Sequence, residues 1–132
     1  MNVNPVKNFY AALWDEYKTA QSAVLLMNVI RRILEYYFLQ LCGYESMSLR
    51  QTILVQGKAE GKFKDADGND DEEKFQLAAA MLAYINASSM GMHDGMDFVE
   101  DCIDAEECRN IFKMIFESMN QKQHYDMMMG IH

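Results

Sequence analysis

The sequence predicts an all-α protein, a compact bundle of five or six helices that forms a single domain over residues 1–132. Half of the residues are hydrophobic, enough to fill a core in a chain of this length. One proline and seven glycines are few, which favours long regular elements over many turns. Apolar residues recur at helical spacing in most segments, and neither a repeat nor a domain boundary is found.

A first helix is predicted over residues 4–21. Asn4 can cap it, and Pro5 suits the first helical position, where a backbone N–H has no intrahelical partner. Apolar and aromatic residues then follow at helical spacing and predict one buried stripe. They are Phe9, Tyr10, Leu13, Trp14 and Tyr17.

A second, longer helix is predicted to follow Ser22 as its cap and to run to Cys42, where Gly43 ends it. Residues 45–61 predict a shorter third helix, although the segment "TILV" within them favours β-structure. Residues 61–74 are rich in Asp, Gly and Asn, and they predict a loop.

The second half of the chain predicts helices on both sides of a break at residues 88–96. Residues 72–89 form a helix whose apolar face comprises Phe75, Ala79, Leu82 and Ile85. Residues 97–129 predict one or two further helices. Asp104 can cap the second of these, with Glu107 completing a capping box. Its apolar stripe comprises Ile111, Met114, Ile115 and Met119.

Neither a metal nor a cofactor is predicted. Asp65, Asp67 and Asn69 alternate as the first ligands of an EF-hand loop do. However, Asp70 stands where that loop needs glycine, and Gln76 stands where it needs a bidentate glutamate. The acidic loop is therefore expected to be a solvated connection.

Charge and cysteine content limit the partners and the compartment. Twelve basic and 20 acidic residues give a net charge of −8, a poor match to non-specific binding of nucleic acid, so a DNA partner is not predicted. Cys42, Cys102 and Cys108 lack zinc-site spacing and are expected to be buried and reduced, as in a cytoplasmic protein. The N-terminus does not resemble a signal peptide, and no membrane segment is predicted.

The segment "NVIRRILEYYF" places four polar residues within a very apolar helix. At about 100° per residue, Asn28, Arg31, Arg32 and Glu35 fall within one arc of the helix. Glu35 is spaced to pair with either arginine. Two interpretations stay open: a structural ion pair at a packing interface, or a polar cleft in which Arg binds an anionic group.

An Arg–Glu–His set could cleave RNA through the ribose 2′-hydroxyl without a metal. One group takes the hydroxyl proton, one protonates the leaving oxygen, and arginine stabilises the charge on the phosphorane. The spacing of the residues alone does not choose between this chemistry and a structural role.

Four segments occur in the chain in this order: "FYAALWDEYK", "LLMNVIRRILEYYF", "AYINASSMGMHDGMDF" and "IFKMIFESMNQKQHYDMM". Together they resemble the C-terminal region of bacterial ABC/AAA-type P-loop ATPases, among them the RNA-targeting anticodon nucleases. The resemblance covers most of the chain, and its most specific parts are "N-x-x-RR-x-LE-YYF" and the late "HY-x-x-M". It implies an all-helical, HEPN-like nuclease region.

The resemblance also implies site residues. In the anticodon nucleases an Arg, a Glu four residues later and a downstream His form the active site. Arg31 and Glu35 match the first two, whereas Met90 stands where the His is expected, directly after Ser89. His93, three residues later, is the substitute expected for catalysis.

The expected RNA contacts are Asn28, Arg32, Ser89 and His124, of which His124 is also a second candidate for the catalytic histidine.

Two functions therefore remain open. One is a nuclease-related effector domain of a phage-defence ATPase that cleaves RNA, tRNA in particular. The other is a non-catalytic helical module that docks on an ATPase or forms a homodimer. The chain has no GxxxxGK[ST] motif, so it is not expected to bind ATP in the manner of the family. It resembles either the C-terminal domain of a larger ATPase or a small truncated relative.

Overall fold

A computed structural model describes residues 5–41, 48–89 and 104–130, and it confirms the predicted all-α fold. Two π-helical segments, η1 and η2, each continue directly into or out of an α-helix, so that six helical rods are present in the described residues. The elements in order are α1 (Pro5–Thr19), α2 (Ala23–Leu34), η1 (Glu35–Leu41), η2 (Arg50–Val55), α3 (Gln56–Ala59), α4 (Glu72–Ser89), α6 (Ala105–Ser118) and α7 (Lys122–Met129).

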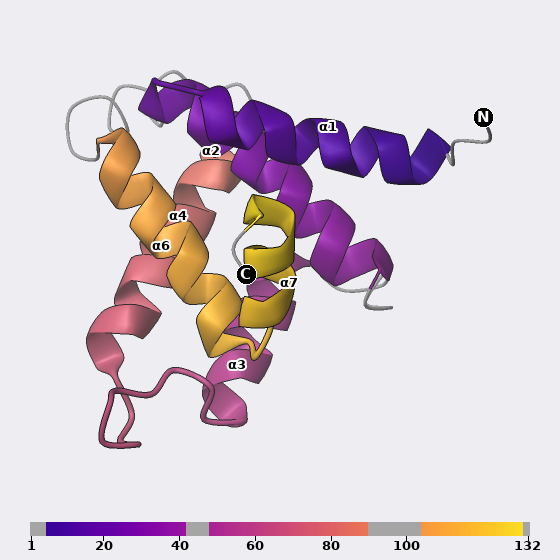
Figure 1. Cartoon of the computed structure of the whole chain (residues 1–132). Helices are drawn as coiled ribbons and strands as arrows, with labels where there is room; N and C mark the ends of the chain where they lie inside the picture. The colour runs from indigo at the N-terminus through magenta and orange to yellow at the C-terminus, as the bar shows by residue number, and fades with distance from the viewer. Residues whose placement is uncertain (1–4, 42–47, 90–103, 131–132) are drawn as a thin grey trace.

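The α2 helix lies at the centre of the bundle and packs against α1, α4 and α6. In Figure 1, α1 crosses one end of the molecule, α6 crosses in front of α4, and α7 lies below α1. Because three helices surround it, α2 buries most of its circumference. Its buried residues are Leu26, Met27, Val29, Ile30, Ile33 and Leu34.

Local capping signals place two of the helices as predicted. The Ser22 hydroxyl accepts a hydrogen bond from the backbone N–H of Leu25 at 3.2 Å, which starts α2. The Asp104 carboxylate accepts one from the N–H of Glu107 at 2.8 Å, which starts α6. Pro5 is the first residue of α1, whereas Asn4 and Gly43 lie outside the described residues.

The segment 45–61 is helical in its described part, because η2 and α3 together cover residues 50–59. The β-prone "TILV" lies inside this helix, and Ile53 and Leu54 are buried there. Burial against α4 therefore outweighs the local β preference of these residues.

The core contains an aromatic cluster centred on Trp14, which is 1% exposed. Its indole packs against rings from α1, α6 and α7 at centroid distances of 5.5–6.2 Å. These rings belong to Tyr17, Phe112, Phe116, His124 and Tyr125. The cluster therefore fastens the two C-terminal helices to α1.

One member of the predicted α1 stripe is not in the core. Leu13 and Tyr17 are buried as predicted, but Phe9 is 54% exposed. Its ring meets Tyr36 edge-on, with centroids 6.2 Å apart, near the N-terminal end of α1. On α4, Leu82 and Ile85 are buried as predicted, together with Ala78 and Met81, whereas Phe75 and Ala79 are half-buried.

Cys108 is fully buried, in agreement with the expectation for the thiols, and its pKa is raised to about 11, first by burial and then by the nearby Asp104 and Glu107 carboxylates. Cys42 and Cys102 lie outside the described residues.

Candidate functional site

The polar stripe of α2 is defined as Asn28, Arg31 and Arg32 of α2 together with Glu35, the first residue of the continuous η1. It reaches solvent along one side of this mostly buried helix. Arg31 Nη1 lies 3.5 Å from Glu35 Oε1, so the predicted ion pair forms with Arg31. The two side chains remain 26% and 45% exposed, while Asn28 and Arg32 are exposed. A pair one helical turn apart and open to water contributes less than about 1 kcal/mol to stability.

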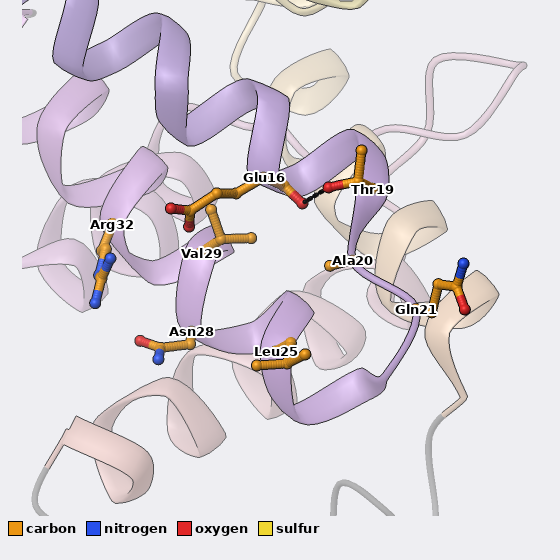
Figure 2. A pocket seen from close by; sticks show the side chains of 8 residues that line it. All are labelled: Glu16, Thr19, Ala20, Gln21, Leu25, Asn28, Val29 and Arg32. Atoms are coloured by element: carbon orange, nitrogen blue, oxygen red, sulfur yellow. Dashed lines mark hydrogen bonds between the residues drawn. The ribbon is translucent and has the colours of Figure 1, made fainter.

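Asn28 and Arg32 line a groove between the C-terminal part of α1 and α2, here called the α1–α2 groove. Its volume is about 500 Å³. Figure 2 shows Glu16, Asn28 and Arg32 at one end of the groove and Thr19 and Gln21 at the other. The remaining lining residues are Ala20, Leu25 and Val29.

The lining of the α1–α2 groove combines an apolar floor with hydrogen-bond donors and acceptors. Val29, which is 3% exposed, and Leu25 supply apolar surface. The Glu16 carboxylate accepts hydrogen bonds, the Arg32 guanidinium donates them, and the Asn28 amide does both. Such a groove can hold a flat, polar-edged group such as a nucleobase next to a phosphate.

The Arg31–Glu35 pair lies beside the α1–α2 groove and does not line it. On a helix, Arg31 is rotated by about 100° from Arg32, so its side chain points along the neighbouring strip of surface. The structure therefore brings the four predicted α2 residues to one exposed side, in two adjoining pairs.

The structure places His124 away from this stripe, within the aromatic cluster. Its ring stacks on Tyr37 with centroids 4.1 Å apart, and a hydrogen bond of 2.7 Å joins Nε2 to the Tyr10 hydroxyl. Tyr37 is two positions after Glu35, and side chains two positions apart on a helix point to nearly opposite sides. His124 is thus held by packing and is not brought to the Arg31–Glu35 pair.

Of the remaining predicted site residues, His93 lies outside the described residues. Ser89 is the last residue of α4, and its side chain lies outside the described part of the structure.

Burial of the imidazole lowers the pKa of His124 below its ordinary value of 6.5. The folded protein therefore holds this ring neutral at pH values where the unfolded chain already binds a proton. The contribution of the neutral His124 ring to stability is fully present above the pKa of the unfolded chain. It is lost as the pH falls from there toward the pKa of the folded protein. We expect the free energy of unfolding, measured by urea denaturation, to decrease between about pH 7 and pH 5.

The variant His124→Gln isolates this contribution because it has no group that titrates in that range. It is expected to have a flatter pH dependence than the parent chain from about pH 7 to pH 5. Equal slopes for the two proteins would show that His124 is as easily protonated in the fold as in the unfolded chain.

The acidic loop is organised by its own hydrogen bonds. Asp65 Oδ1 accepts from the N–H groups of Asp67 and Asn69 at 2.9 and 3.0 Å, and Lys64 Nζ lies 2.9 Å from Asp70 Oδ1. Within the described ranges, no cluster of three or more His, Cys, Asp or Glu side chains has the arrangement of a metal site.

The sequence did not predict two sets of residues that line or position the α1–α2 groove. Glu16 and Thr19 reach the α1–α2 groove only because α1 packs on α2, and no local spacing indicates this. Arg109 of α6 donates hydrogen bonds to the carbonyl oxygens of Tyr17 at 3.2 Å and Ala20 at 2.5 Å. It thereby fixes the end of α1, which forms one wall of the groove.

Comparison with known proteins gives no match to a family, to a curated protein or to a solved structure. No helix in the described parts of the chain combines the length and apolar character that crossing a membrane requires.

Proposed function

We propose that this chain is an RNA-targeting effector domain, related to the nuclease region of anticodon nucleases and acting in the cytoplasm, in which the polar stripe of α2 contacts the RNA. The observation that carries the proposal is the state of the Arg31–Glu35 pair. The two side chains are paired at 3.5 Å yet open to solvent, so their charges can meet a ligand. A purely structural ion pair in such an apolar helix would be expected to face a packing partner.

In the proposed reaction, Glu35 accepts the proton of a ribose 2′-hydroxyl. The 2′-oxygen bonds to the adjacent phosphorus, and the bond from phosphorus to the 5′-oxygen breaks, leaving a 2′,3′-cyclic phosphate. Arg31 stabilises the negative charge that develops on the phosphoryl oxygens. The leaving 5′-oxygen requires a proton, and the proposed donor is His93, which stands three residues after Met90, the position where the family carries its histidine.

Asn28 and Arg32 hold the neighbouring nucleotide in this proposal. Arg32 binds phosphate or a base edge, and Asn28 bonds to a base edge within the α1–α2 groove. Because the net charge of the chain is −8, binding should depend on this local site and not on a broad basic surface.

The test is cleavage of total bacterial tRNA by the purified chain, followed on denaturing gels, together with growth of cells that express it. Arg31→Ala and Glu35→Gln are expected to lower cleavage by about 10²-fold or more while leaving the helical content unchanged. Arg50→Ala is the matched control, since Arg50 is an exposed arginine on a different helix. Cleavage that survives in both stripe variants would contradict the proposal.

A second function, a non-catalytic module that docks on an ATPase or forms a homodimer, is favoured by a different observation. Four large hydrophobic side chains are 54–64% exposed, namely Phe9, Leu25, Val55 and Met127. Light scattering separates the two functions: a monomer that cleaves tRNA supports the first, and an oligomer that leaves tRNA intact supports the second.

A further inference from the structure

A second groove, here called the α3–α4 groove, lies between the η2–α3 helix and α4. Its volume is about 600 Å³. It is lined by Arg50, Leu54, Val55, Lys58, Ala59, Phe75, Gln76 and Ala79. None of these residues belongs to the polar stripe of α2 or to the α1–α2 groove.

The floor and walls of the α3–α4 groove are mostly apolar. Val55 is 60% exposed, and Phe75 and Ala79 are half-buried. An exposed valine beside a half-buried phenylalanine leaves apolar surface in contact with water. Such surface, set between two helices, has the shape that receives the apolar face of a third helix.

Two cations flank this apolar surface. Arg50 and Lys58 are both exposed and stand eight positions apart along the η2–α3 helix. The Lys58 ammonium lies 4.4 Å from the centre of the Phe75 ring and 4.0 Å from Glu72 Oε2. Although the net charge of the chain is −8, the two cations make the border of this apolar groove locally complementary to an acidic partner.

We propose that the α3–α4 groove binds an acidic amphipathic helix of another protein. The apolar face of that helix covers Val55, Phe75 and Ala79, and its carboxylates meet Arg50 and Lys58. At the α-helical rise of 1.5 Å per residue, eight positions span roughly 12 Å, and the π-helical part over Arg50–Val55 makes this span somewhat shorter. Carboxylates about seven or eight residues apart on the partner therefore fit the two cations.

A second copy of this chain is a poor occupant for two reasons. A twofold contact through the groove would bring Arg50 and Lys58 of one copy against the same cations of the other. The amphipathic helices α2 and α6 already bury their apolar faces in the core, so a folded copy cannot offer either one.

Binding of a helix in the α3–α4 groove is independent of the proposed RNA function. Substitutions in the groove leave Arg31 and Glu35 untouched, so loss of partner binding and loss of RNA cleavage can be measured separately.

The probe is a fluorescently labelled peptide of about sixteen residues, stapled as a helix, with one leucine face and two glutamates about seven positions apart. A matched peptide carries lysines in place of the two glutamates. Fluorescence anisotropy with the full chain is expected to show tighter binding of the glutamate peptide. In ¹⁵N-labelled protein, the largest amide shifts are expected at residues 50–59 and 75–79.

The double variant Arg50→Glu with Lys58→Glu is expected to weaken binding of the glutamate peptide by about tenfold and to restore binding of the lysine peptide. Lys18→Glu, an exposed lysine on α1, is the control and should leave both affinities unchanged. Val55→Glu should abolish binding without unfolding the chain, because this side chain is exposed.

Equal binding of the two peptides, or no binding of either, would overturn the proposal. So would light scattering that shows a dimer which Val55→Glu dissociates, since the groove would then be an interface between copies of this chain.

Discussion

Replacement of Trp14 by alanine is expected to lower the free energy of unfolding by about 3–5 kcal/mol. The side chain is 1% exposed and packs against rings from three helices, so truncation leaves a large cavity where α1, α6 and α7 meet. The indole N–H has no hydrogen-bond partner among the described residues, so the loss comes from packing alone. Urea denaturation followed by far-ultraviolet circular dichroism measures it.

Phe9→Ala provides the matched control on the same helix. Phe9 is 54% exposed and meets Tyr36 edge-on, so its removal is expected to cost less than about 1 kcal/mol. Similar losses in the two variants would mean that the aromatic cluster is not centred on Trp14.

The second large effect is expected for Arg109→Ala, at about 1.5–3 kcal/mol. The guanidinium satisfies the carbonyl oxygens of Tyr17 and Ala20 at the end of α1 and lies 5.6 Å from the centre of the Tyr17 ring. Its loss leaves these carbonyls without their donor and loosens α1 from α6. The same denaturation experiment measures the change.

Lys113→Ala, on the same helix, removes a positive charge without these contacts and is expected to change stability by less than about 0.5 kcal/mol. Arg109→Lys keeps the charge but loses the planar guanidinium with its several N–H donors. Its loss in the free energy of unfolding is therefore expected to lie between those of Lys113→Ala and Arg109→Ala. If Arg109→Ala behaves like Lys113→Ala, the contacts to α1 do not stabilise the fold.

The parts of the fold that depend on neighbours in sequence could be predicted. The caps at Ser22 and Asp104 act on N–H groups three residues later, and the Arg31–Glu35 pair spans one helical turn. Such interactions are fixed once a segment is helical, so the spacing of residues is sufficient to indicate them.

The parts that depend on tertiary contact could not be predicted. His124 meets Tyr10 across 114 positions, and Arg109 meets Ala20 across 89. The α1–α2 groove likewise needs Glu16 and Asn28 from two helices. Helical spacing also placed Phe9 on the stripe with Leu13, but it does not show where the covering helices end.

The candidate site also has one part that local spacing predicts and one part that depends on tertiary contact. Its α2 residues share one exposed side because helix geometry places them there. In the proposed RNA cleavage the third group comes from elsewhere in the chain, and the sequence gives two candidates, His93 and His124. The structure holds His124 in the aromatic cluster, which leaves His93 as the proposed proton donor.

We propose that the Arg31–Glu35 pair serves a ligand and not the fold. The most direct measurement is the free energy of unfolding of Arg31→Ala, Glu35→Ala and the double variant, compared with the parent chain. We predict losses below about 1 kcal/mol and a coupling energy of about 0.5 kcal/mol or less, as for a solvent-open pair one turn apart. A loss above about 3 kcal/mol for either single variant would instead show that the pair is structural.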